Sequence, residues 1–501
     1  MSLRQNIIAN YLGQAWVAAM GLAFIPLYIR YLGIESFGLM GLFALIQAWM
    51  TLLDMGMTPT IGREMARFSA GEHSPQAIRN LLRSLELLAS CLAVLIVIAV
   101  WGASDWLASD WLKPTTLSIA TVSQAIVLMG LVVGLRFVEG LYRSALFGLQ
   151  RQVWYNAVNA GLATLRGLGA LAVLALVSPT IGAFFAWQVL ISVLTLAVLA
   201  LGVHRSLPQA PLPAAASVAT LQPVWRFAGG MTGITFLAVL LTQVDKLLLS
   251  KMLSLEQFGY YAFAAMVAGV LYMLVAPITT ALFPRLVEWV SRKDEGALAQ
   301  AYHHGAQLVT LATVPLALVL GLHGEGVLYA WSADAALAGY AGPILSALAI
   351  GTLLNCLMYV PYQAQLAHGW TGLTLKINIV AVVVLVPALF WVVPRHGALG
   401  AAWVWIVLNA GYLLVAIGLM HRRILPAEKW RWYGQDIIAP TLAAAASLLL
   451  LHGLAPEAGQ RRLAWCAYLG TALLVAFLAA SMSLRDIRER VFLSMRRAVN
   501  P

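Results

Sequence analysis

The sequence predicts an all-α integral membrane protein with about 14 transmembrane helices: two parallel-repeat six-helix bundles plus two C-terminal helices. Hydrophobic residues make up 61% of the 501 positions and charged residues only 10%, whereas soluble domains carry about 25% charged residues. The apolar runs are about 20 residues long and lack the two-residue alternation of barrel strands, which favours helices. A short motif in the first quarter of the chain also recurs near its middle.

The predicted spans begin at Ile7 and end at about residue 482. The first run is too long for the apolar core of a signal peptide, about 7 to 15 residues, and is therefore predicted to be a retained helix. The approximate spans are 7–29, 37–58, 81–101, 117–135, 152–177, 181–203, 226–249, 259–282, 304–323, 341–366, 374–393, 397–420, 436–453 and 463–482.

The distribution of basic residues predicts the orientation of these helices. With the N-terminus inside, 22 of the 31 Lys and Arg residues fall in the inner segments and six in the outer ones. Basic residues are retained on the cytoplasmic side of a membrane. Both termini are therefore predicted to be cytoplasmic. Because this asymmetry accounts for the net charge of +11, the charge gives no reason to expect nucleic acid as a partner.

An internal repeat relates the two halves of the chain. The motif Leu32-Gly33-Ile34-Glu35-Ser36-Phe37-Gly38 recurs as Leu253-Ser254-Leu255-Glu256-Gln257-Phe258-Gly259, a shift of 221 positions that also places Arg30 on Lys251. Six helices return the chain to the side on which it started, so the two copies have the same orientation. Parallel repeats that rock around a central site are a recurring plan of transporters.

The repeat and the composition predict five regions. The stretch after the first bundle contains several prolines among small residues and is expected to be an irregular cytoplasmic linker. The basic, partly apolar C-terminal tail is expected to lie on membrane lipid. The regions are 1–205 (first six-helix bundle), 206–223 (linker), 224–422 (second six-helix bundle), 423–484 (extra helix pair) and 485–501 (basic cytoplasmic tail).

Ionisable residues inside the predicted spans are candidate functional groups, because charges in lipid are costly unless they face a cavity or a partner. Arg166 lies near the middle of the fifth span, where it either lines a cavity or bonds carbonyls of a neighbouring helix. Asp245 and Lys246 are consecutive in the seventh span. Consecutive helical side chains point about 100° apart, so each is expected to have its own partner, either in a site or in a structural salt bridge.

Other basic residues gather at the predicted inner and outer ends of the helices. Arg136, Glu139 and Arg143 have spacings of three and four, which put them on one helix face near the inner boundary. Four more basic residues lie near the inner boundary: Arg63, Arg67, Arg285 and Lys376. They either anchor the protein to the inner leaflet or form, together with Arg136 and Arg143, a basic inner mouth suited to a diphosphate. Arg30 and Lys251 occupy matched outer ends, and Pro26 is expected to break the first helix near Arg30.

These residues form the two candidate sets. The candidate substrate-binding residues are Arg30, Arg63, Arg143, Arg166, Lys246, Lys251, Arg285 and Lys376. The candidate ion-coupling residues are Asp54, Glu139 and Asp245. The three cysteines all fall in apolar runs and the nine histidines have no ligand spacing, so no metal, disulfide framework or catalytic residue is predicted.

Several motifs resemble those of a known family. Asn10-Tyr11-Leu12-Gly13-Gln14, Pro26 to Gly33, Asp54-Met55-Gly56 and Arg63-Glu64-Met65-Ala66-Arg67 resemble the bacterial polysaccharide transporter family, and Asp245 to Leu249 with Leu255 to Tyr261 resembles its middle signature. That family comprises O-antigen and oligosaccharide flippases of the multidrug/oligosaccharidyl-lipid/polysaccharide superfamily. The likeness covers about 420 residues by pattern and is most specific at the N-terminal segment.

The resemblance implies two bundles around a cationic lumen that carry an undecaprenyl-diphosphate-linked oligosaccharide to the periplasmic leaflet by alternating access. It also implies a location in the inner (cytoplasmic) membrane of a bacterium, coupling to H⁺ or Na⁺, no other cofactor, and work beside a polysaccharide polymerase and a chain-length regulator. Among the candidate residues, Arg30, Asp54, Arg63 and Asp245 match the family patterns.

Several other functions remain open from the sequence. A lipid II flippase or a cation-coupled drug exporter belongs to the same superfamily, but a drug-cation exporter should have an acidic cavity. A membrane-embedded polysaccharide polymerase or glycosyltransferase commonly carries catalytic groups on a large loop, and the longest loops here are about 20 residues. A scaffold without a transport role would leave Arg166 and Lys246 unexplained.

Overall fold

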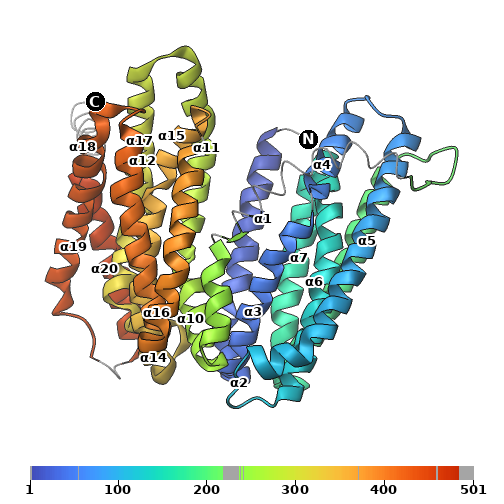
Figure 1. Ribbon diagram of the computed structural model, residues 1–501, viewed down its shortest axis with the longest axis horizontal. Helices are drawn as coiled ribbons and strands as arrows, with labels where there is room; N and C mark the ends of the chain where they lie inside the picture. The colour runs from blue at the N-terminus through green and yellow to red at the C-terminus, as the bar shows by residue number, and fades with distance from the viewer. Residues whose placement is uncertain are drawn as a thin grey trace, which may run out of the picture. The chain divides into compact units, whose positions relative to one another are not determined.

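The structure is a computed structural model that describes residues 3–54, 56–217, 236, 239–240, 242–370, 372–457 and 461–484. Within these ranges the backbone forms helices joined by short connections and contains no strand (Figure 1), which confirms the predicted all-α class. The Cα packing divides the chain into two compact units, residues 1–259 and 260–501. The domain boundaries proposed from the sequence remain predictions, and the predicted tail at 485–501 lies outside the described residues.

The first unit is built around one long central helix, α6, which packs against α3, α4, α5 and α8. Buried side chains of α4, α5, α6 and α8 form its hydrophobic core. The elements are α1 (Leu3–Ala23), α2 (Ile25–Leu32), α3 (Ile34–Met50), η1 (Thr51–Asp54), α4 (Met57–Ser69), α5 (Pro75–Trp106), η2 (Leu107–Trp111), α6 (Ile119–Gly148), α7 (Gln152–Leu176) and α8 (Ile181–Ser206).

The second unit has its own core, to which α11, α12, α14, α15, α19 and α20 contribute. The elements are α10 (Leu255–Ala268), which begins in the first unit, α11 (Val270–Arg292), α12 (Glu295–Leu322), α13 (Gly324–Ser332), α14 (Ala335–Leu357), α15 (Tyr359–Ala367), α16 (Gly372–Gly411), η3 (Tyr412–Ala416), α17 (Ile417–His421), η4 (Pro426–Glu428), α18 (Lys429–Arg431), η5 (Trp432–Ile438), α19 (Ala439–His452) and α20 (Arg462–Ser483).

Twelve helical segments of the described chain are long and apolar enough to cross a membrane, so the predicted number of about 14 is not confirmed. The difference has two sources. The predicted span 226–249 lies mostly outside the described residues. The predicted spans 374–393 and 397–420 fall within one continuous segment, Gly372–His421, interrupted at Gly397 by a non-helical conformation with φ 58° and ψ −145°.

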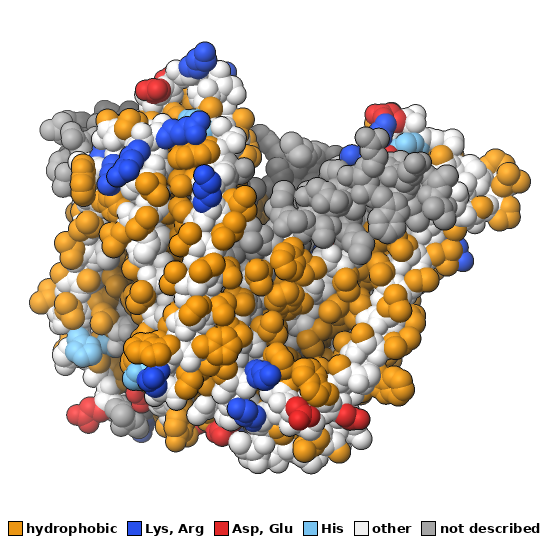
Figure 2. Space-filling model, viewed as in Figure 1, with side chains coloured by type: hydrophobic (Ala, Val, Ile, Leu, Met, Phe, Trp, Pro, Cys, Tyr) orange, Lys and Arg blue, Asp and Glu red, His pale blue; other side chains and the backbone are white. Residues whose placement is uncertain are grey.

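Hydrophobic side chains cover the middle of the helices on the visible face of each unit, and charged side chains gather towards the helix ends (Figure 2). Large apolar side chains such as Leu176, Leu450 and Leu463 are more than three quarters exposed. A water-soluble protein does not expose so much apolar surface, whereas lipid accommodates it. The exterior of each unit is thus that of a multi-pass membrane protein.

Glycines set two of the helix boundaries in the first unit. Gly33, between α2 and α3, has φ 79°, and Gly56, just before α4, has φ 74°. Side chains other than glycine rarely adopt positive φ, so both positions favour glycine. The first helix breaks at Phe24, so the break expected from Pro26 lies two residues before the proline, and Pro26 itself stands in the first turn of α2. A proline is tolerated there because a first-turn N–H has no helical acceptor.

The two copies of the repeated motif pack directly on each other within the first unit. A Cβ added to Gly38 of α3 would lie 2.5 Å from the carbonyl oxygen of Leu255, and one added to Gly259 would lie 2.3 Å from that of Ile34. These four residues are equivalent in pairs through the repeat shift of 221 positions. The contacts are therefore reciprocal, as expected where two repeats meet around a local pseudo-twofold axis.

The described part of the predicted linker, 207–217, has no regular secondary structure but is bound along α5. Leu212 N donates to Gln76 Oε1 at 3.1 Å, Ala215 N to Asn80 Oδ1 at 3.0 Å, and Ser217 N to Ser84 Oγ at 3.0 Å. Residues 76, 80 and 84 recur every four positions and so lie along one helix face. The beginning of the predicted linker is thus fastened to the first unit.

Within the second unit, a buried polar network joins α12 to the predicted extra helix pair. His303 of α12 is only 2% exposed and hydrogen-bonds through Nδ1 to Asp436 and through Nε2 to Glu428, the latter at 2.8 Å. Gln307 donates to the other oxygen of Asp436 at 2.9 Å. A carboxyl oxygen thus stands against each ring nitrogen of His303, so both nitrogens are held in the network.

Candidate functional site

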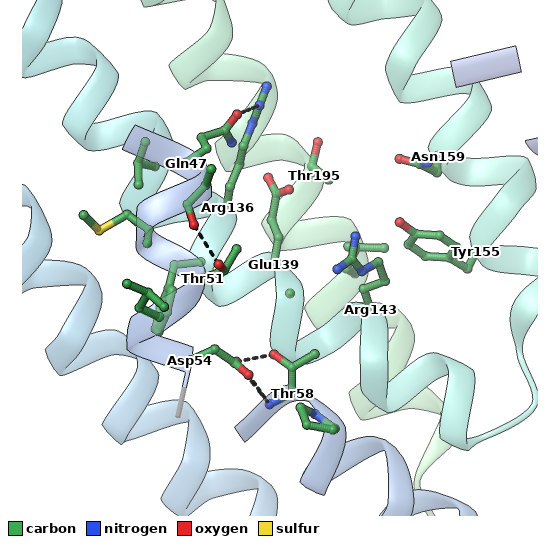
Figure 3. Close-up of a pocket in the computed structure, with 18 of the residues that line it drawn as sticks. Gln47, Thr51, Asp54, Thr58, Arg136, Glu139, Arg143, Tyr155, Asn159 and Thr195 are labelled. Carbon is green, nitrogen blue, oxygen red and sulfur yellow. Dashed lines mark hydrogen bonds between the residues drawn. The ribbon is translucent and has the colours of Figure 1, made fainter. Parts of the chain in front are cut away.

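A cavity of about 780 Å³ opens inside the first unit, between α1, α3, η1, α4, α6, α7 and α8. Charged and neutral polar side chains line it, although the helices that carry them are mostly apolar. Figure 3 shows Glu139 near the centre of this cavity, with Arg136 and Arg143 on either side and Asp54 beyond it. The polar lining residues used below are Gln47, Asp54, Thr58, Arg136, Glu139, Arg143, Tyr155, Asn159, Arg166 and Thr195.

Three arginines give the cavity its basic character. Arg136 and Arg143 lie on α6 and Arg166 on α7. The guanidinium of Arg136 donates to Gln47 Oε1 at 3.0 Å and stands 5.1 Å from the centre of the Phe43 ring. Arg166 donates to Thr195 Oγ1 at 3.4 Å. In the described part of the chain the buried Nε of each has no hydrogen-bond partner, so both retain N–H groups for a ligand.

Two carboxylates share the cavity but differ in their partners. Asp54 accepts hydrogen bonds from the backbone N–H of Thr58, at 3.1 Å, and from its hydroxyl. Glu139 Oε1 is buried and, among the described residues, accepts none. No arginine nitrogen of that part of the chain lies within ion-pair distance, 4.0 Å, of Glu139. Three guanidinium groups against two carboxylates leave the lining formally cationic.

Local sequence explains how these groups reach one place. Arg136, Glu139 and Arg143 are three and four positions apart on α6, so they project from the same face, as predicted. Asp54 ends η1 and its carboxylate caps the first turn of α4, which the positive φ of Gly56 redirects. Side-chain oxygens that accept from early helix N–H groups stabilise the start of a helix.

Four of the eleven predicted site residues line this cavity: Asp54, Glu139, Arg143 and Arg166. Three others lie elsewhere in the first unit. Arg30 is exposed on α2, and Arg63 is exposed on α4, where it pairs with Glu64 at 2.9 Å. Lys251 does not line the cavity either; its Nζ stands 4.7 Å from the centre of the Trp111 ring.

The remaining four predicted residues also lie outside the cavity lining. Contrary to expectation, Lys246 Nζ reaches the neighbouring Asp245 Oδ1 at 3.7 Å and donates to Thr242 O at 3.0 Å. The lysine chain is long and flexible enough to fold back, so a difference of about 100° between Cβ directions does not prevent the contact. In the second unit, Arg285 on α11 and Lys376 on α16 are exposed.

Some lining residues were not among the predicted site residues. Arg136 shares the helix face of Glu139 and Arg143, a spacing visible in the sequence. Gln47, Asn159 and Thr195 are neutral polar residues in apolar helices, and nothing in the sequence assigns them to the same cavity. Their convergence depends on how α3, α7 and α8 pack.

Solved structures share this fold. A lipid II flippase MurJ in an inward closed conformation has a TM-score of 0.71 at 12% identity, covering 96% of this chain and 99% of the flippase. An inward-facing MATE family transporter of the MOP superfamily, from the multidrug resistance group, has a TM-score of 0.60 at 14% identity, covering 86% of this chain and 96% of the transporter. At these identities the likeness concerns the fold alone.

Sequence comparison identifies a related protein. A Shigella flexneri protein named "Putative O-antigen transporter" is 23% identical over 408 residues, which is 81% of this chain and 94% of that protein. The proteins matched are transporters and a flippase rather than enzymes. The membrane-spanning helices, the fold and these relatives together define a multi-pass membrane transporter, not an enzyme.

The family assignment is narrower than this class. The family described as "Polysaccharide biosynthesis protein" matches residues 3–290, more than half of the chain. The chain therefore belongs to the polysaccharide biosynthesis protein family, as the resemblance in its N-terminal motifs indicated.

Proposed function

We propose that this protein is a flippase that moves an undecaprenyl-diphosphate-linked oligosaccharide from the cytoplasmic to the periplasmic leaflet by alternating access. The observation that carries the proposal is the cavity of the first unit, where Arg136 and Arg166 each keep a guanidinium N–H that no described residue accepts, among mostly apolar helices. Guanidinium forks match phosphate oxygens, and such contacts strengthen where water is scarce. A diphosphate headgroup is the ligand that this lining suits best.

The charge of the cavity also separates the proposal from its alternatives. A cavity with Arg136, Arg143 and Arg166 repels cationic drugs, which weakens the drug-exporter alternative. Lipid II also carries a diphosphate, so the arginines do not distinguish the two flippase functions. The relationship to the Shigella flexneri protein favours an O-antigen-type glycan.

The proposal also covers the location of the protein, its coupling ion and its functional partners. The asymmetry of Lys and Arg supports an inner-membrane protein with both termini in the cytoplasm. A coupling ion, H⁺ or Na⁺, would act at Asp54, Glu139 or Asp245, the first two of which line the cavity. A polysaccharide polymerase and a chain-length regulator are the proposed functional partners, because they would use the exported glycan.

The test replaces one cavity arginine at a time in a bacterium that depends on this gene for surface glycan. Arg166→Ala should reduce glycan export at least about tenfold, because loss of one charge-assisted contact costs about 1.5–3 kcal/mol, while protein abundance in the membrane stays normal. Arg292→Ala is the matched control, since Arg292 is exposed outside the cavity lining, where it pairs with Glu288 at 2.7 Å and stands over the Trp289 ring. Normal export with Arg166→Ala and with Arg136→Ala would refute the proposed role of the cavity.

A further inference from the structure

Glu139 is a carboxylate surrounded by positive charge that it does not bind. Arg136, Arg143 and Arg166 all lie near enough to interact with its charge, yet within the described chain none comes within ion-pair distance of it. Its Oε1 is buried and has no hydrogen-bond donor among the residues that the structure describes. Helix positions on α6 and α7 hold the four groups around one space, and Figure 3 shows Glu139 projecting into it.

A diphosphate diester placed in that space changes the charge balance. Such a headgroup carries one negative charge on each phosphate, so the two carboxylates and the ligand would set four negative charges against three guanidinium groups. Like charges at short range in a site of low dielectric strongly disfavour one another. Uptake of one proton by one carboxylate would restore neutrality within the cavity.

Hydrogen bonding decides which carboxylate takes that proton. Asp54 accepts from the backbone N–H and the hydroxyl of Thr58, and hydrogen bonds to a carboxylate favour its charged form. Glu139 Oε1 has no such bond among the described residues. A protonated Glu139 would also become a hydrogen-bond donor to a phosphate oxygen that the carboxylate would repel.

Few other groups could take the proton. The titratable or charged cavity residues are Asp54 from η1, Arg136 and Arg143 from α6 with Glu139 itself, and Tyr155 and Arg166 from α7; the cavity residues on α1, α3, α4 and α8 are neutral. Arginine remains protonated in proteins, and a tyrosine at neutral pH is already protonated. Glu139 and Asp54 are therefore the two candidates, and hydrogen bonding favours Glu139.

We propose that the cavity binds the lipid-linked diphosphate together with one proton, which Glu139 takes from the solvent as the headgroup arrives. This inference rests on the proposed function and specifies how a proton takes part in binding. Proton and anion then bind cooperatively, because each stabilises the other in the cavity. By linkage, the affinity for the diphosphate should weaken as the pH rises through the titration of Glu139.

The test measures protons and affinity together on the full-length protein in nanodiscs. The probe is undecaprenyl-diphospho-N-acetylglucosamine, whose phosphates are both diesters; a phosphate monoester would itself titrate near pH 6. The solution is weakly buffered at a pH at which Glu139 is ionised in the free protein. A pH-indicator dye should then report uptake of about one proton per bound ligand. The Kd should rise by up to about tenfold per pH unit above that titration.

Variants assign the proton to a residue. Glu139→Gln should bind the probe without proton uptake and with a Kd that does not change with pH, whereas Asp54→Asn, the matched carboxylate in the same cavity, should still take up a proton. Glu139→Ala provides a second removal of the carboxyl group if the glutamine variant is poorly folded.

Binding by the wild type without proton uptake, or uptake that persists in Glu139→Gln, would overturn this inference and leave the proposed function standing. Failure of the wild type to bind, or equal binding by Arg166→Ala, would instead overturn the proposed function.

Discussion

The arginines of the first unit fall into two chemical situations. Arg63 and Arg67 of α4 both bond to Glu64, whose carboxylate also accepts from His73 at 2.7 Å. Arg136 and Arg166, by contrast, each retain a buried Nε without a partner among the described residues. A saturated guanidinium stabilises the protein, whereas an unsaturated one in a cavity is available to a ligand. The first pair is thus held by Glu64, whereas the second pair retains the N–H groups on which the proposed role of the cavity depends.

The pKa of Glu64 should make the stability of the protein sensitive to acid. Burial raises this pKa, but hydrogen bonds from His73 and Arg63 and the charges of Arg67 and Arg63 outweigh burial, so the pKa lies below its ordinary value. A lowered folded-state pKa gives stabilisation that is complete above the unfolded-state pKa and is lost as the pH falls through the folded-state value. Glu64→Gln should lower stability at neutral pH by about 1 kcal/mol and flatten the acid side of the profile.

Thermal unfolding of the detergent-solubilised protein between about pH 3.5 and 7 tests this expectation. Glu288→Gln is the control, because its pair with Arg292 is half exposed and should contribute little. A Glu64→Gln protein with the wild-type pH profile would show that the cluster around Glu64 does not stabilise the fold.

The repeated glycines lie where α3 and α10 cross at close range. Gly38 and Gly259 allow the starts of α3 and α10 to approach so closely that backbone carbonyls fill the space of the missing side chains. Small residues permit such contacts between membrane helices, where packing rather than hydrophobic burial drives association. The recurrence of glycine at both positions is thus explained by a shared contact.

A methyl group at this crossing should separate the helices. Gly38→Ala would place its Cβ 2.5 Å from the Leu255 carbonyl oxygen, a backbone atom that cannot rotate away. The expected loss is about 1–3 kcal/mol, typical of overpacking, measured as a lower midpoint of thermal unfolding. Gly21→Ala on α1 is the matched control, because nothing lies within 4 Å of an added Cβ there. Equal midpoints for the two variants would disprove a close crossing at Gly38.

For the whole molecule, the decisive pattern is the placement of charge relative to the membrane. Twenty-two of the 31 basic residues fall in the predicted inner segments, and on the face that Figure 2 shows each unit is mainly hydrophobic between its helix ends. The positive-inside rule then predicts that both termini lie inside. The cavity's Asp54 and Arg143 lie near the predicted inner ends of their helices, so the cavity should receive its ligand from the cytoplasm.

Single cysteines test this orientation. After replacement of Cys91, Cys356 and Cys466 by alanine, Pro179→Cys lies between α7 and α8 and Ser291→Cys near the end of α11. A membrane-impermeant maleimide should label position 179 in intact spheroplasts and position 291 only after permeabilisation, because basic residues around position 291 hold that end inside. The reverse pattern would invert the predicted topology.

Much of the fold was predictable from short-range features. Apolar runs of membrane-spanning length placed most helices, and the repeat of Leu32 to Gly38 at Leu253 to Gly259 indicated duplication before any contact was known. The number of spans is harder to compare, since the spans predicted at 374–393 and 397–420 fall in one segment, Gly372–His421, which the non-helical conformation of Gly397 divides. Hydropathy reports length and composition, and the backbone conformation at the glycine shows where the two helices meet.

The site was predictable only where its residues share one helix. The spacing of Arg136, Glu139 and Arg143 places them on one face of α6 by helix geometry alone. Arg63 and Lys251 look equally basic in the sequence, yet Glu64 pairs with the first and Trp111 packs on the second. Sequence patterns do not show which partner, if any, neutralises a charge.

The sequence by itself determined that this is a membrane-spanning helical protein, and it predicted the orientation of the helices and their origin in a repeat, because length, hydropathy and charge asymmetry act locally along the chain. Only the tertiary structure decided that Asp54, Arg166 and Thr195 meet the face of α6 around one cavity. The reason is that burial and pairing depend on contacts between segments distant in sequence. Those contacts determine which charges are neutralised and which remain available to a ligand.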